Sequence, residues 1–278
     1  MIEAILNYQF MQNALMTAIM ASIVCGIIGT IVVEKKLVMM SGGIAHTAFG
    51  GIGLGYWLGF EPILGALIFS AGSSLLITTI KRKTNTNTDT LIGILWSTGM
   101  ALGILFIYLS PGYPPDMASY LFGDILTVTH FDLYIIFGLV VFTVFVIIAF
   151  FSRWLSYLFD DEFSFVIGMN TCFMEYFMFL LIALSIVVLI RVVGIILVIA
   201  LLTAPTAIAK QFTFNLKFLM IISSLIGMII SISGIWLSFY LNIPSGAMII
   251  LLLSALFFVS TFFNRKKKAG KSLSIGKK

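Results

Sequence analysis

Long apolar runs, separated by short polar or basic segments, fill the chain from one end to the other. A helix that crosses a bilayer needs about 20 consecutive, mostly apolar residues. On this pattern we expect nine helices, at about 9–33, 37–59, 62–80, 90–109, 133–151, 173–190, 194–209, 217–240 and 246–263. The predicted fold class is therefore an all-α polytopic membrane protein with about eight or nine transmembrane helices. The segment 110–132 is too rich in proline and polar residues to cross, so we expect it to lie at an interface or to re-enter.

Composition narrows the class of protein. Of the 278 residues, 60% are hydrophobic and 10% are charged, and the mean hydropathy is +1.14. Soluble domains carry about 25% charged residues, so a soluble enzyme and a soluble binding module are excluded. The chain contains no GxxxxGK[ST] phosphate loop, no HExxH and no GxSxG. We therefore predict no catalytic residue, and any ATP must be hydrolysed by a separate subunit.

The basic residues predict an orientation in the membrane, because Lys and Arg accumulate in cytoplasmic loops. Nine crossings with the C-terminus inside place every Lys and Arg except Arg191 on the cytoplasmic side. The expected domains are a transmembrane domain, 1–264, and a basic cytoplasmic tail, 265–278, whose charge suits anionic lipid better than nucleic acid. The predicted location is a cell membrane, either plasma or inner.

One cytoplasmic loop, 152–171, carries a pattern of its own. Three acidic residues, Asp160, Asp161 and Glu162, are typical of a helix start. Apolar residues then follow at helical spacing, and Gly168 is expected to end the helix. An amphipathic helix outside the bilayer needs a surface to dock on. It either lies on lipid headgroups or couples the membrane domain to a cytoplasmic partner.

His46 is the one histidine placed inside a predicted transmembrane helix. At 1.5 Å per residue it lies roughly 14 Å from the inner end of that helix, near the middle of a bilayer core of about 30 Å. Gly42 and Gly50 share its helix face, and Gly43 and Thr47 flank that face. Glycine leaves space beside the imidazole, and the series Gly51, Gly55 and Gly59 has the GxxxG spacing of close helix packing. His46 is therefore either a buried packing residue or a ligand for a divalent cation in transit.

Several segments together resemble the permease subunits of ATP-binding-cassette importers for divalent metals, the zinc, manganese and iron family of ABC-3 type. The resemblance covers most of the chain in family order. The matching segments are MMSGGIAHTAFGGIGLGYWLG (39–59), DTLIGILWSTGMALGILF (89–106), LFGDILTVTHFDL (121–133), FDDEFSFVIGMN (159–170), VGIILVIALLTAPTAIAK (193–210) and LNIPSGAMIILLLSALFF (241–258).

The resemblance implies the partners and the roles of several residues. The partners would be a cytoplasmic ATP-binding subunit, an extracytoplasmic metal-binding protein and a second permease copy, usually identical. His46 matches the histidine of the family's translocation path. Within 159–170, the positions that match the family's coupling loop are Phe159, Asp160, Glu162 and Gly168.

Gly42 departs from the family pattern, because many members have aspartate four residues before this histidine. The second ligand would then come from Met39, Met40, Asn13 or the partner protomer, or the ion would bind more weakly. Carboxylate oxygens suit manganese, whereas imidazole suits zinc and iron. The missing carboxylate therefore slightly favours zinc or iron over manganese, with zinc as the first choice for the transported metal, and no permanently bound cofactor is expected.

The expected mechanism is delivery of the ion to an outer mouth, passage beside His46, and exit driven by the ATP-binding subunit. Asp116, Asp124 and Asp132 would form the mouth and concentrate cations there. They could equally be solvated loop charges. Two other functions stay open at this point: a proton-coupled secondary metal transporter with His46 as its protonating group, and a purely structural membrane subunit in which His46 can be replaced.

Overall fold

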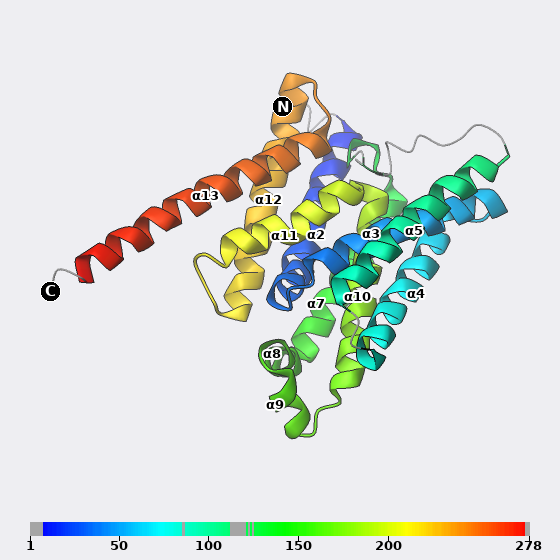
Figure 1. Cartoon of the computed structure of the whole chain (residues 1–278). Helices are drawn as coiled ribbons and strands as arrows, with labels where there is room; N and C mark the ends of the chain where they lie inside the picture. The colour runs from blue at the N-terminus through cyan, green and yellow to red at the C-terminus, as the bar shows by residue number, and fades with distance from the viewer. Residues whose placement is uncertain (1–7, 85–86, 112–120, 122, 124, 276–278) are drawn as a thin grey trace.

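A computed structural model of the chain describes residues 8–84, 87–111, 121, 123 and 125–275, and the last twelve of these for their backbone alone. Every regular element in this part of the chain is helical (Figure 1). The elements are α2 (Gln9–Glu34), α3 (Val38–Leu58), α4 (Pro62–Lys83), α5 (Thr88–Leu109), the short 3-10 helix η1 (Ile125–Thr127), α7 (His130–Ala149), α8 (Phe151–Phe159), α9 (Asp161–Val166), α10 (Thr171–Val193), α11 (Ile195–Ala209), α12 (Leu216–Leu241) and α13 (Ser245–Ile275).

The helices confirm the predicted all-α membrane fold. Each of the nine expected segments is a helix, and seven of the helices are long and apolar enough to cross a membrane. The other two are α3, in which glycines and His46 lower the hydropathy, and α11, which has only 15 residues. Most of the segment 110–132 lies outside the described residues, so its expected place at an interface stays a prediction. Helix α13 continues to Ile275, through most of the predicted tail.

The bundle has two halves around α2 (Figure 1). On one side α3 packs against α4 and α5, and on the other α11 and α12 pack against α2. Helices α8 and α9 lie together at one end, next to α7 and α10, whereas α13 leaves the bundle at an angle. Helix α3 is buried along most of its length, so its residues are held by neighbours on several sides.

Glycines bring the helix backbones of α3 and α4 into direct contact. A Cβ atom on Gly51 would overlap the carbonyl group of Gly65, and a Cβ atom on Gly65 would overlap the carbonyl of Gly51. One turn later, a Cβ atom on Gly55 would lie 2.6 Å from Cα of Pro62. The predicted role of Gly51 and Gly55 in close helix packing is therefore confirmed. Gly59 ends α3 instead, with a φ of 73°.

Several basic side chains form ion pairs at one end of the bundle, which we call the basic end. Both carboxylate oxygens of the buried Glu175 accept hydrogen bonds, from Lys81 Nζ at 2.7 Å and from Arg82 Nε at 2.6 Å. Lys210 pairs with Glu34 at 3.0 Å, and Lys35 pairs with Asp161 of α9. The predicted membrane topology places these four cations on the same side of the membrane. Their ion pairs, which lie at one end of the bundle, agree with that topology.

Arg191 lies at the opposite end of the bundle. It is the one basic residue that the predicted topology places on the other side of the membrane. Its Nε atom donates to Asp132 Oδ1 at 2.6 Å, and its Nη1 atom lies 3.2 Å from Glu61 Oε1. Three segments meet in this cluster: the end of α10, the start of α7 and the turn between α3 and α4. It holds the far end of the His46 helix against two other helices.

Candidate functional site

Helix α3 presents one face to α5, and three of the predicted path residues lie in that contact. A Cβ atom on Gly43 would lie 2.6 Å from Cγ2 of Ile92. The Thr47 hydroxyl donates to the carbonyl of Gly43 at 2.7 Å and contacts the carbonyl of Leu95 at 3.3 Å. In the conformation described, Gly43 and Thr47 therefore make packing contacts between α3 and α5, and neither of them lines an open path.

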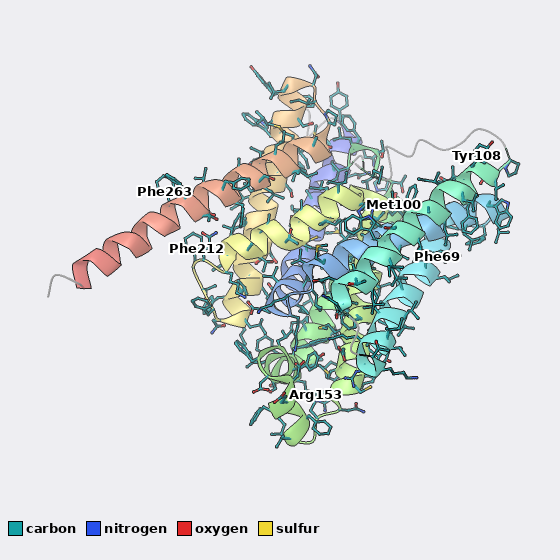
Figure 2. The ribbon with its side chains drawn as sticks, viewed as in Figure 1. Phe69, Met100, Tyr108, Arg153, Phe212 and Phe263 are labelled. Atoms are coloured by element: carbon teal, nitrogen blue, oxygen red, sulfur yellow. The ribbon has the colours of Figure 1, made fainter. Side chains whose placement is uncertain are left out.

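Gly50 lies further along the same contact between α3 and α5, toward the C-terminal end of α3. A Cβ atom on Gly50 would lie 2.8 Å from the carbonyl oxygen of Gly99 and 3.1 Å from the ring of Phe69, which projects from α4. Figure 2 labels Phe69 on that helix, beside α5. The three helices thus interlock around glycines, which fixes the register of α3 and hence the position of His46.

The imidazole of His46 is stacked on the indole of Trp96 from α5. The ring centroids are 4.2 Å apart, and the planes are inclined by 13°. Within the described part of the chain, Nδ1 of His46 is buried and has no hydrogen-bond partner. A buried polar atom without a partner is costly, and such atoms call for an explanation such as a missing ligand or water. The expected space beside the imidazole is occupied by Trp96.

Gly42 lies one turn before His46 on the same face of α3. A Cβ atom there would lie 3.5 Å from Cζ3 of Trp96 and 3.9 Å from Cδ1 of Ile199 in α11. Both are ordinary contact distances. Gly42 and His46 therefore face the place where α5 and α11 approach α3, whereas Gly43, Thr47 and Gly50 face the α5 backbone or α4.

The structure describes all three residues of this chain that the sequence suggests as a second ligand. The side-chain amide of Asn13 donates to the carbonyl of Val128 at 3.0 Å. Met40 is fully buried, and Met39 is exposed at the start of α3. Among the described residues, no group of three or more His, Cys, Asp and Glu side chains could hold a metal ion. The side-chain amide of Asn13 is thus engaged elsewhere, and the ligand roles of Met39, Met40 and the partner protomer stay predictions.

Asp132 is the only predicted mouth residue that the structure describes, since Asp116 and Asp124 lie outside the described residues. Its Oδ1 atom accepts from Arg191, and its Oδ2 atom accepts from the backbone and hydroxyl of Thr129 at 3.1 and 2.6 Å. Both oxygens thus have partners, and the residue completes a capping box at the start of α7. The predicted cation-concentrating role of the three aspartates stays a prediction.

The loop 152–171 folds into two helices, of which the second is the predicted one. Asp160 is the N-cap of α9, where its Oδ1 atom accepts from the backbone N–H of Phe163 at 2.9 Å. Gly168 follows the helix with a φ of 83°, a conformation that favours glycine. Helix α8 is a further amphipathic helix, in a segment that the sequence predicts as loop, and it buries Trp154, Tyr157 and Leu158.

The outer surface of this helix pair is apolar and unpartnered in the single chain. Phe163 is 57% exposed and Val166 is 80% exposed, and Phe159, Phe165 and Ile167 are also exposed. The predicted coupling residues Phe159, Asp160, Glu162 and Gly168 therefore all lie on or beside the same end of the bundle. Arg153, labelled in Figure 2, lies on α8 next to them.

Lys35 connects this helix pair with the His46 helix, and sequence reasoning missed it. It lies in the turn between α2 and α3, where its ammonium pairs with Asp161 and lies 4.1 Å from the ring centroid of Tyr157. The next residue, Lys36, has a φ of 58°, so the turn has a fixed, unusual backbone. Burial raises the pKa of the Tyr157 hydroxyl, which therefore remains protonated and neutral beside these charges. The ion pair thus joins α9 to the turn that precedes α3.

Comparison with known proteins places the chain in a family. Residues 7–264 match the ABC 3 transport family. An uncharacterised membrane protein of Synechocystis is 40% identical over 268 residues, covering 95% of each chain. The manganese import system permease protein ScaB of Streptococcus gordonii is 33% identical over 267 residues, covering 96% of each chain.

Likeness to a solved structure extends the match to three dimensions. A chain in the structure of PsaBC from Streptococcus pneumoniae in complex with Fab superimposes with a TM-score of 0.84 at 32% identity, covering 93% of each chain. The predicted absence of an ATPase in this chain agrees with these relationships. The chain belongs to the ABC 3 transport family and is a multi-pass membrane permease subunit of a transporter whose ATPase is a separate subunit.

Proposed function

We propose that this chain is the membrane-spanning subunit of an ATP-driven importer for a divalent metal ion. The observation that carries the proposal is the family match over residues 7–264, together with a relative of nearly equal length named as a manganese import permease. The partners would be a cytoplasmic ATP-binding subunit, an extracytoplasmic metal-binding protein and a second copy of the permease. The comparisons do not support the alternative of a proton-coupled secondary transporter.

The basic end of the bundle faces the cytoplasm in this proposal, and so does the C-terminus. The excess of Lys and Arg in short loops at that end supports this orientation, and Arg191 is the exception at the other end. Helices α8 and α9 then lie where a cytoplasmic subunit can reach their exposed apolar surface. An apolar surface of this kind marks a protein or membrane contact, and we assign it to the ATP-binding subunit.

We propose manganese as the transported metal, instead of the zinc favoured by the sequence. The preference for zinc rests on the missing carboxylate at Gly42, and that position concerns only the ligands that one chain supplies. The name of the ScaB relative points to manganese. In a two-copy permease, the ion would meet His46 from each chain, and weak binding suits a path from which the ion must also leave.

Uptake of radioactive manganese tests the transported metal. Vesicles would contain this chain, its ATP-binding subunit and its binding protein. We expect ATP-dependent manganese accumulation that excess unlabelled manganese abolishes and equimolar zinc lowers only slightly. Accumulation of zinc in preference to manganese would overturn the metal assignment and leave the importer assignment standing.

Gly168 tests the coupling role of α9. In the Gly168→Val variant we expect ATP hydrolysis to continue while metal uptake falls, because a β-branched residue at a φ of 83° costs roughly 1–2 kcal/mol and reshapes the end of α9. Hydrolysis and uptake would be measured in the same vesicles, as moles of ATP per mole of metal.

Gly59→Val is the matched control. Gly59 has a similar φ of 73°, and a Cβ atom meets nothing within 4 Å at either glycine. It lies at the opposite end of the bundle, so the same backbone penalty should leave the ratio of hydrolysis to uptake unchanged. An equal change of that ratio in both variants would remove the special role of Gly168.

A further inference from the structure

We propose that Lys35 is a positioning residue for the ATP-binding subunit: its ammonium group bridges Tyr157 of α8 and Asp161 of α9, and thereby fixes the orientation in which α9 presents its apolar surface. This inference rests on the proposed function, in which the ATP-binding subunit docks on α8 and α9. It adds to that surface a residue of the turn between α2 and α3, which lies 126 positions before Asp161.

Apolar packing does little to hold α9 against the rest of the bundle. Ser164 is the one buried residue among the six of this helix, and its hydroxyl donates to the carbonyl of Asp160 at 2.7 Å, within the same segment. The large side chains of Phe163, Phe165 and Val166 are each more than half exposed. Most of the stability of a short helix in a protein comes from burial of an apolar face. Helix α9 therefore needs another contact to fix its orientation.

The ion pair between Lys35 and Asp161 supplies that contact. Within the described part of the chain, it is the one side-chain hydrogen bond or ion pair that joins α9 to a residue outside 160–169. Asp161 and Ser164 are three residues apart and share a face of α9. At about 100° per residue, Phe163 and Val166 lie near the opposite face. Holding Asp161 against the bundle therefore turns Phe163 and Val166 away from it.

Lys35 is itself held by two other elements. Its backbone N–H donates to the carbonyl of Ile31 in α2 at 3.0 Å, and its side chain is only 15% exposed. The ammonium lies 4.1 Å from the ring centroid of Tyr157, which is buried with Trp154 on the inner face of α8. A cation over an aromatic ring is stabilised most where water is excluded. Lys35 thus joins the weakly packed α9 to the end of α2 and to the well-packed α8.

Amide hydrogen exchange of the full-length permease in detergent tests whether the ion pair holds α9. Lys35→Gln removes the charge and keeps most of the side-chain length. We expect peptides covering 161–167 to exchange about three- to tenfold faster in this variant, since an exposed ion pair and a cation–π contact are each worth a small factor. Lys35→Arg keeps the charge and a cation over the ring, so its exchange should stay within about twofold of the natural chain.

Binding of the purified ATP-binding subunit to the detergent-solubilised permease tests the positioning role. We expect Lys35→Gln to raise the dissociation constant about three- to tenfold. The Tm of the permease alone should stay near the natural value, because α9 contributes little to the packed bundle. Asp161→Asn should weaken binding similarly. The double variant should bind no more weakly than either single variant, since both changes remove the same contact.

Two variants at the basic end are the controls. Lys36→Gln removes the neighbouring charge of the same turn, and Lys36 is exposed. Lys210→Gln removes a different ion pair, with Glu34 at 3.0 Å, which includes neither α8 nor α9. Both controls should bind the subunit with the natural affinity. A loss as large as that of Lys35→Gln in either control would overturn the inference, because basic charge alone would then account for binding.

The exchange and binding results together separate this inference from the proposed function. Unchanged exchange and binding in Lys35→Gln would overturn the inference and leave an importer that needs its ATP-binding subunit. Weaker binding without faster exchange would make Lys35 a direct contact of the subunit and would overturn its positioning role. Faster exchange with unchanged binding would reject α9 as the docking surface, and with it that part of the proposed function. Additive losses in the double variant would overturn the bridge.

Discussion

Metal uptake should fall to about a tenth or less when His46 is replaced by alanine, because the proposed path loses the imidazole that each copy contributes in the membrane interior. Even the loss of a residue that only orients a metal ligand typically costs about 10–100-fold in affinity or activity. Assembly should survive, since Nδ1 of His46 has no hydrogen bond within the described chain that the substitution could break. His46→Gln, which keeps more of the side-chain volume, should lose uptake as well.

His130→Ala is the matched control for this experiment. His130 is the only other histidine of the chain, and it lies at the opposite end of the bundle from α8 and α9, where its Nε2 atom is 2.8 Å from Nε2 of Gln9. Its loss should leave uptake near the natural level. Uptake, ATP-binding subunit retention and the elution volume of the complex would be measured together. A His46→Ala chain that no longer assembles would support the packing role of His46, and normal uptake would support the purely structural subunit.

The second large effect is expected on stability, at the contact between α3 and α4. Gly51→Ala places a methyl group where the Gly65 carbonyl lies, and backbone atoms on both sides leave no flexible group to move aside. Inserting a methyl group into a packed interior typically costs roughly 1–3 kcal/mol, and we expect the upper end of that range here. The apparent Tm of the detergent-solubilised permease should fall accordingly.

The same substitution at Gly72 should have the opposite sign. Gly72 lies in α4, the helix that Gly51 contacts, but a Cβ atom there meets nothing within 4 Å. Alanine is favoured over glycine inside a helix by about 1 kcal/mol, so Gly72→Ala should leave the Tm unchanged or raise it. Comparable losses of stability at both glycines would mean that helix packing does not distinguish the two positions.

The helices were predictable because a bilayer imposes a strong, local constraint on the sequence. Apolar length predicts seven of the nine segments as spans and marks α3 and α11 as weaker apolar runs, and the acidic start and Gly168 stop of α9 follow from capping chemistry. The glycine spacing in α3 correctly indicated close packing at Gly51 and Gly55. Apolar length does not predict helix α8, because its nine residues are too few for a crossing.

The site was only partly predictable because its geometry depends on contacts between distant residues. Periodicity places His46 and Gly42 on one face of α3, but it does not identify the residue that faces them. Trp96 lies 50 residues after His46, in a helix that reads as an ordinary crossing. The partner of Asp132 is equally remote, since Arg191 is 59 positions away. The residue pattern within a single helix carries no signal for either pairing.

ATP dependence is the most direct measurement of the central claim. Vesicles containing the permease, its ATP-binding subunit and its binding protein would be loaded with ATP on the side of the ATP-binding subunit, and manganese uptake would be followed with and without a proton gradient. We predict uptake that requires ATP and disappears when the phosphate-loop lysine of the ATP-binding subunit is replaced. Uptake driven by the proton gradient alone, or unaffected by that replacement, would contradict the account.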